Sequence, residues 1–201
     1  MTIAPESPKL VPIEGKSGTT RLAEDHLTFV KVGFGYSIEV LIKNGYETDG
    51  ATIPEQLMKD KEYGNQIWDF IRSKYRDIKT TSEVDDLIRR LVGTPWDMPR
   101  LLAAIVHDVL YGLKWKIRWL CDRIYRLILL ENNYDLIRAD IEYCGIRLIG
   151  WKNWEAGTKA EKRQTKQLTV VRFIRDKKIR REIERLRKDR GQKLLIKKSS
   201  L

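Results

Sequence analysis

The sequence predicts an α+β fold: a small antiparallel β-sheet near the N-terminus, then a helical bundle and a basic C-terminal helical arm. Residues 27–42 are rich in β-branched and aromatic types with partial alternation, which is typical of strands. From residue 99 apolar residues recur at helical spacing almost to the end. Lys and Arg are concentrated after residue 159. The 201 residues, 42% of them hydrophobic, suffice for one domain with a sizeable core.

The N-terminal part divides into an arm and the start of a domain. Residues 1–18 contain three prolines and little periodicity, which indicates a loose arm before a domain over residues 19–158. Two strands are expected at the start of the domain, and the glycines between them suit a turn. Asn44–Gly45 is a second turn signal.

The rest of the domain is predicted to be mainly helical. Residues 55–97 are polar and hard to place, so we interpret them as an insertion with helical stretches over 63–75 and 82–92. Three helices are then expected, over residues 99–111, 114–132 and 134–148. Residues 150–157 are predicted to form a turn. A last helix is predicted over residues 159–190, and its thin apolar stripe indicates weak packing or contact with a partner.

The net charge of +11 belongs to one end of the chain. From Lys159 to Leu201 there are 17 Lys and Arg against 5 Asp and Glu, whereas residues 1–158 hold 22 basic and 23 acidic residues. This asymmetry indicates an electrostatic arm, residues 159–201, that binds nucleic acid or an acidic partner. The basic residues expected to make the contacts are Arg172, Arg175, Lys177, Lys178, Arg180, Arg181, Arg185, Arg187, Lys188 and Arg190.

Binding by this arm is expected to be non-specific. Phe173 is its only aromatic residue, so base stacking is not expected and phosphate contacts would dominate. Two other interpretations stay open. The arm is a solvated helix that only aids solubility, or it lies on a membrane surface, because residues 194–198 are apolar and then basic.

The cysteines, the apolar stretches and the N-terminal residues indicate which classes of protein fit this sequence. Cys121 and Cys144 lie in helical patterns, which indicates buried free thiols in a reducing compartment. No Cys or His pair has the spacing of a zinc knuckle. The longest apolar stretch, residues 101–106, is shorter than the about 20 residues that span a bilayer. Residues 1–8 lack a basic start and an apolar run, so we expect no secretory leader.

Three short segments place acids and one histidine where packing alone does not explain them. His107 and Asp108 interrupt an otherwise apolar helix, and their burial is costly unless they are hydrogen-bonded. Tyr111 lies one turn after His107, on the same helix face. Asp49 sits in a turn, and Asp122 starts the polar face of the next helix. If these groups converge, they form a small acidic pocket around one imidazole.

Two interpretations of this pocket stay open. In the first, His107 is a core histidine and the acids are ordinary turn, cap and salt-bridge residues. In the second, the catalytic residues are Asp49, His107 and Asp108. One divalent metal ion, zinc or manganese, would then be held by Asp49, His107, Asp108 and Asp122. A metal-bound water would be the nucleophile and a spare carboxylate the base. The second histidine, His26, lies in the strand region without a matching motif.

The same segments resemble the DUF1353 family, uncharacterised proteins of tailed bacteriophages and prophages. The family pattern consists of a TDGASIP turn, an HDYLY helix, an AD helix and a VRLFG ending. The matching segments here are TDGATIP at 48–54, AAIVHDVLY at 103–111, DRIY at 122–125 and IRLIG at 146–150. The resemblance covers residues 45–154 and departs from the family pattern at Thr52, Val109 and Cys121.

The resemblance implies a phage or prophage origin, hence a place in the virion or the host cytoplasm, but it supplies no reaction. It favours a virion-associated or assembly component whose basic arm binds nucleic acid or other phage structural proteins. In that function the buried polar groups pin the turn to the helices. The alternative function is a small metal-dependent hydrolase.

Overall fold

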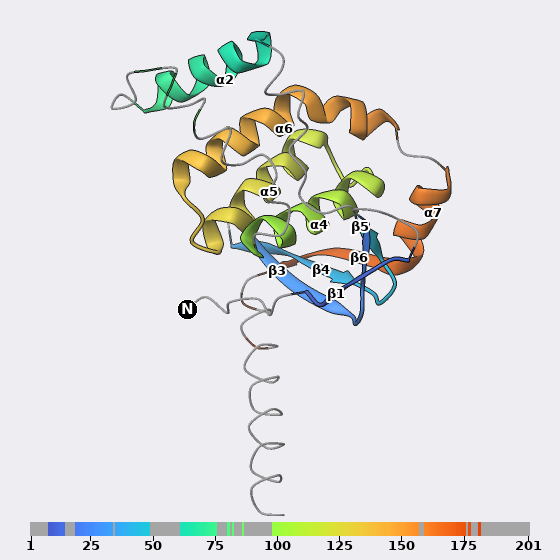
Figure 1. Cartoon of the computed structure of the whole chain (residues 1–201). Helices are drawn as coiled ribbons and strands as arrows, with labels where there is room; N and C mark the ends of the chain where they lie inside the picture. Colours follow the sequence, from blue (N-terminus) through green and yellow to red (C-terminus); the bar gives the residue numbers. More distant parts are fainter. Residues whose placement is uncertain are drawn as a thin grey trace, which may run out of the picture.

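A computed structural model gives the fold of this chain. The residues that it describes are 8–14, 19–33, 35–48, 61–75, 80, 82, 86, 98–156, 159–175, 177 and 181. Over these residues the chain is α+β, as predicted. Two three-stranded antiparallel sheets lie beneath a set of packed helices (Figure 1).

The first sheet joins the N-terminal strands to the segment that leads into the Asp49 turn. Its strands are β1 (Leu10–Pro12), β2 (Thr20–Leu22) and β5 (Glu47–Thr48), in the order β1-β2-β5. Because β1 pairs with β2 along its length, its residues belong to the fold, which differs from the loose arm predicted there. Thr20 pairs with Thr48, so this sheet fixes the residue just before Asp49.

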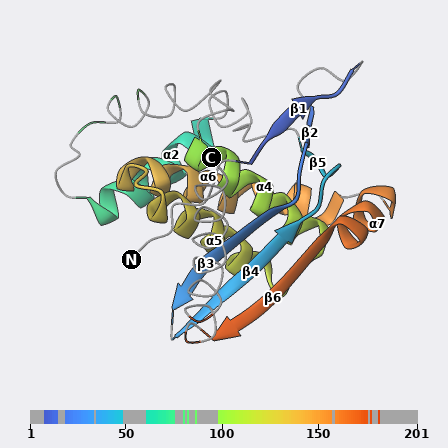
Figure 2. The same ribbon diagram turned by 90° about the horizontal axis from the view of Figure 1, so that it is seen from below.

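The second sheet is larger and forms the floor of the core. Its strands are β3 (His26–Gly33), β4 (Tyr36–Ile42) and β6 (Thr169–Arg175), in the order β3-β4-β6. Gly33 and Gly35 at the β3–β4 turn have φ values of 102° and 75°, where other residues are strained. Both strands predicted for this hairpin are confirmed. Figure 2 shows β6 lying along β4 at the outer edge of the sheet.

β6 corrects the prediction of one helix over residues 159–190. Only α7 (Lys159–Leu168) is helical before the chain turns into the strand. The first three residues of β6 are Thr, Val and Val, which pack well on a pleated surface. All seven β6 residues pair with β4, so the sheet contacts outweigh the helical tendency of the surrounding charged residues. Except for 177 and 181, residues from 176 on lie outside the described part of the chain.

The helices stack in layers over the second sheet. In Figure 1, α2 lies on α6, α6 lies above α5, and α4 and α5 lie nearest the strands. Their bounds are α2 (Lys61–Lys74), α4 (Met98–Gly112), α5 (Arg118–Glu131) and α6 (Leu136–Ala156). The three helices predicted after residue 99 are confirmed. The turn predicted at 150–157 is wrong over 150–156, because α6 continues there and Trp154 packs against the core.

α4 is apolar on nearly every side because it runs through the centre of the core. Ile105 and Val109 have no exposed surface, and neither do Ile38 and Val40 on the inner face of β4. At its C-terminal end α4 approaches α7 so closely that a Cβ on Gly112 would lie 2.7 Å from the Thr165 hydroxyl oxygen. Because α4 lies in this apolar setting, a polar side chain buried on it needs a hydrogen-bond partner.

α2 is attached to the rest of the fold through α6. A second, smaller apolar cluster joins Ile67 and Ile71 of α2 to Ile141 and Cys144 of α6. α2 confirms the helix predicted near residues 63–75. The stretch predicted over 82–92 lies outside the described residues, apart from 82 and 86. In the described part of the chain, no helix combines the length and the apolar character needed to cross a membrane.

Candidate functional site

Asp122 lies at the centre of a buried polar network, which we call the Asp122 network. The Nε2–H of His107 donates to Oδ1 of Asp122 at 3.0 Å, and the Tyr111 hydroxyl donates to the same oxygen at 2.5 Å. The guanidinium of Arg147 donates to Oδ2 at 2.6 Å. The Asp122 side chain has no exposed surface. Both carboxylate oxygens are therefore occupied by protein donors.

Three helices supply the Asp122 network. His107 and Tyr111 lie one turn apart on α4, Asp122 is on α5 and Arg147 is on α6. The ring centroids of His107 and Tyr111 are 3.9 Å apart and their planes are inclined at 40°, so the two side chains reach Asp122 as a pair in contact. Gly150 of α6 leaves room for them, because a Cβ there would lie 2.7 Å from the Tyr111 hydroxyl oxygen. The network thus joins α4, α5 and α6.

The Asp122 carboxylate stays ionised in this network. Burial raises its pKa, but hydrogen bonds from His107, Tyr111 and Arg147 outweigh burial and hold the pKa below its usual value. Burial and the neighbouring Asp122 raise the pKa of Tyr111, so the phenol keeps its proton. Since a carboxylate only accepts hydrogen bonds, neutral His107 carries its proton on Nε2. The lone pair of Nδ1, which does not face Asp122, is then the one available to a metal ion.

The residues predicted for the acidic pocket are only partly brought together. His107 and Asp122 are in contact, as the pocket requires. Asp108 points to a different partner, since the Thr48 hydroxyl donates to its Oδ2 at 3.1 Å and so ties β5 to α4. Asp49 lies outside the described residues. Among the described residues, no group of three or more His, Cys, Asp or Glu side chains is placed to hold a metal ion.

A second buried acid, Glu142 of α6, was not predicted from the sequence. The Tyr125 hydroxyl donates to its Oε2 at 2.5 Å, and the Tyr134 hydroxyl donates to its Oε1 at 2.6 Å. Nε of Arg100 lies 3.0 Å from Oε1, and the Arg100 and Glu142 side chains are 1% and 0% exposed. Their ion pair joins the start of α4 to α6 inside the core.

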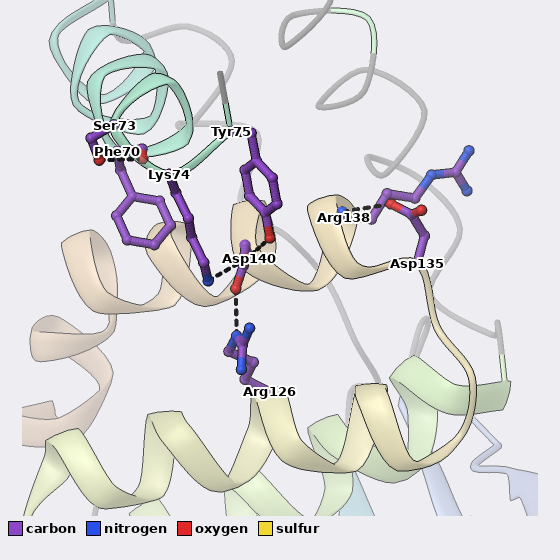
Figure 3. A network of polar contacts seen from close by, with 8 residues as sticks. All are labelled: Phe70, Ser73, Lys74, Tyr75, Arg126, Asp135, Arg138 and Asp140. Carbon is purple, nitrogen blue, oxygen red and sulfur yellow. Dashed lines mark hydrogen bonds and ion pairs between the residues drawn. The ribbon is translucent and has the colours of Figure 1, made fainter. Parts of the chain in front are cut away.

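A third buried acid, Asp140, attaches α2 to the bundle. Figure 3 shows its carboxylate between Lys74 and Tyr75 at the end of α2 and Arg126 of α5. The Lys74 ammonium lies 2.6 Å from Oδ2 of Asp140. Burial raises the pKa of Asp140, but the hydrogen bonds from Arg126, Lys74 and Tyr75 bring it below its usual value. This carboxylate is therefore the ionic anchor of α2.

The sequence pattern did not single out these two acids, and their burial is seen only in the structure. Asp140 and Glu142 flank Ile141 in a segment whose neighbours Ala139 and Cys144 are also buried. Such a segment packs on both sides, so an acid within it needs a cationic or hydroxyl partner. The two cysteines agree with their prediction as buried free thiols, and burial raises the pKa of Cys121 to about 12 and that of Cys144 to about 11.

The predicted basic contacts are exposed where the structure describes them. Arg172 and Arg175 on β6 are exposed, as are Lys177 and Arg181 beyond it. Arg172 retains 67% of its side-chain surface and lies 3.9 Å from Glu39, too far to neutralise it fully. The other predicted contacts lie outside the described residues, namely Lys178, Arg180, Arg185, Arg187, Lys188 and Arg190.

No protein-family model matches this chain, and no curated protein or solved structure is significantly similar to it. The resemblance to the DUF1353 family therefore stays a prediction. The functional conclusion rests on the geometry of the side chains and the charge of the chain.

Proposed function

We propose that this chain is a bacteriophage-encoded component of the virion or of its assembly that binds nucleic acid through its basic C-terminal residues. The observation that carries the proposal is the exposed set of cations on and just after β6, Arg172, Arg175, Lys177 and Arg181. Residues 159–201 hold a net charge of +12, whereas residues 1–158 hold −1. A neutral domain with one strongly cationic segment favours a polyanionic partner. The phage origin rests on the DUF1353 resemblance.

The buried acids fit a structural task in this function. Each of Asp122, Asp140 and Glu142 is contacted by donors from at least two other secondary-structure elements or segments. Buried carboxylates that are fully hydrogen-bonded fix the packing of the elements around them. The His107 motif then serves to hold the domain together, and the domain presents the cations.

Salt dependence of binding tests the proposal. We expect the full chain to bind a duplex DNA of mixed sequence with an affinity that falls steeply as salt rises. Replacing Arg172 and Arg175 with Gln should weaken binding and reduce the slope of log K against log salt by about 0.9 for each lost phosphate contact. The measurement is fluorescence anisotropy of a labelled duplex over a salt series.

The matched control removes two exposed arginines elsewhere. Arg21 on β2 and Arg72 on α2 are exposed and far along the chain from β6. The Arg21→Gln/Arg72→Gln variant carries the same net charge as Arg172→Gln/Arg175→Gln. Equal losses of affinity in the two double variants would contradict a binding surface at β6, because only net charge would then matter.

One observation favours the alternative, a small metal-dependent hydrolase. The Nε2–H of His107 is held by a buried carboxylate, the arrangement that commonly orients a metal-ligating histidine. In this function Asp122 orients the imidazole, and Nδ1 of His107, Asp49 and Asp108 would be the ligands for zinc or manganese. The metal would supply a nucleophilic water. Stoichiometric metal that is lost in His107→Ala would support the hydrolase and justify a search for its substrate.

A further inference from the structure

An aromatic and cationic surface lies where the α4–α5 turn meets β6. The rings of Trp115 and Phe173 are in contact, with centroids 4.9 Å apart and planes inclined at 39°. The Lys116 ammonium lies 5.6 Å from the Phe173 ring centroid. On the first two turns of α5, the guanidinium of Arg123 lies 5.5 Å from the Trp119 ring centroid. We call Trp115, Lys116, Trp119, Arg123 and Phe173 the aromatic–cationic patch.

The patch leaves large rings in contact with solvent. Phe173 is 46% exposed and Trp119 is 45% exposed, and Ile117 between the two tryptophans is 60% exposed. Exposed apolar side chains that gather at one place mark an interaction surface, and the half-exposed Phe173 in contact with Trp115 is such a place. Residues 113–119 contain three cations and no acid. The partner that this surface fits therefore combines flat apolar groups with negative charge.

The backbone of the turn is fixed in an uncommon conformation. Lys114 and Lys116 have φ values of 47° and 60°, in the left-handed region that non-glycine residues seldom adopt. Hydrogen bonds hold the turn there, because the Trp115 N–H donates to the Leu110 carbonyl at 2.9 Å and the Trp115 carbonyl accepts from the Cys121 thiol at 3.1 Å. With the Lys114 N–H donating to the Tyr111 carbonyl at 2.9 Å, this is the left-handed cap that commonly ends a helix, and it fixes the position of Trp115.

We propose that the aromatic–cationic patch binds single-stranded nucleic acid. Bases would stack on the exposed faces of Phe173 and Trp119, and phosphates would contact Lys116 and Arg123. Arg175 follows Phe173 two residues later on the same face of β6 and would continue the phosphate track. This inference rests on the proposed nucleic-acid function and adds a preference for single strands. This surface could not be predicted from the sequence, because Trp115 and Phe173 are far apart along the chain.

The test compares single and double strands on the same variants. An oligothymidine of about 20 nucleotides suits a site of this size, since single domains cover roughly 4–16 nucleotides. Phe173→Leu and Trp119→Leu should each raise the Kd for the oligothymidine by at least about fivefold, because one stacked base is lost. The Kd for a duplex of equal length should change by less than about twofold, because the phosphate contacts are retained.

Trp151→Leu is the matched control, since Trp151 is another tryptophan of similar exposure, 48%, that lies on α6 and is not one of the five patch residues. It should leave both Kd values unchanged, and thermal unfolding should show that all three variants fold. Equal changes for single and double strands in the patch variants, or no change in either, would overturn the inference and leave the proposed function standing. Displacement of the oligothymidine by poly-glutamate with equal potency would assign the patch to acidic protein and overturn it. Absence of binding to either nucleic acid would overturn both proposals.

Discussion

Replacing Glu142 with Met is expected to lower the free energy of unfolding by about 3–5 kcal/mol, the cost typical of breaking a buried ion pair. The variant leaves the guanidinium of Arg100, which is 1% exposed, in the core without the Glu142 charge. It also removes the acceptor for the hydroxyls of Tyr125 and Tyr134. Urea denaturation followed by circular dichroism measures this loss.

A double-mutant cycle separates the ion pair from simple loss of packing. Arg100→Met alone should also be strongly destabilising, because the Glu142 carboxylate is then buried without that cation. The double variant, Arg100→Met/Glu142→Met, should be much more stable than the sum of the two single losses predicts, since neither charge remains. Additive losses would contradict a coupled pair at this position.

Asp122→Asn is expected to lower the free energy of unfolding by about 3 kcal/mol, because hydrogen bonds to a charged acceptor are each worth about 1.5–3 kcal/mol. The amide has nearly the same shape as the carboxylate, but its NH₂ group cannot accept a hydrogen bond. Whichever way the amide is turned, it places a donor against His107 and Tyr111 or against Arg147. The loss in free energy of unfolding therefore measures the hydrogen bonds of the Asp122 network and not the cost of a cavity.

The same variant should lose part of the acid sensitivity of the protein. The pKa of Asp122 lies below its ordinary value of 3.8 in the folded chain, so its contribution to stability is present above that value. That contribution is lost as the pH falls through the lowered folded pKa, because the unfolded chain then binds more protons. The difference in free energy of unfolding between wild type and Asp122→Asn should thus shrink from pH 7 to about pH 2.

A surface carboxylate supplies the control for this pH dependence. Asp69 is exposed on α2, so Asp69→Asn should leave both the stability at pH 7 and its fall in acid nearly unchanged. A stability difference for Asp122→Asn that stays constant with pH would contradict a lowered pKa of Asp122 in the folded protein.

Most of the fold could be predicted from local patterns in the sequence. The β3–β4 hairpin and α4 are confirmed because period-two alternation and a dense apolar helix depend on nearby residues alone. β6 was missed because its charged neighbours resemble a helix, while its stability comes from β4, far away along the chain. Gly150 suggested a turn, but its role in α6 is to make room for Tyr111.

The candidate site was predictable only where a polar residue interrupts an apolar pattern. His107 stood out in α4, and its contact with Asp122 confirms that the two segments converge. Arg100 and Glu142 gave no such signal, because a charged residue near a helix start or among mixed neighbours is usually exposed. Their pairing depends on the packing of α4 on α6, which local periodicity does not encode.

We propose that His107 holds α4, α5 and α6 together and is not a ligand of a catalytic metal ion. Elemental mass spectrometry of purified, unchelated wild type and His107→Ala, alongside urea denaturation, tests it most directly, with His26→Gln as the control for the other histidine. We expect no stoichiometric zinc or manganese in any of them, and a free energy of unfolding lowered by about 1–3 kcal/mol in His107→Ala, as for a lost buried hydrogen bond. Near-stoichiometric metal in wild type and His26→Gln, lost in His107→Ala with unchanged stability, would contradict the claim and establish the metal site.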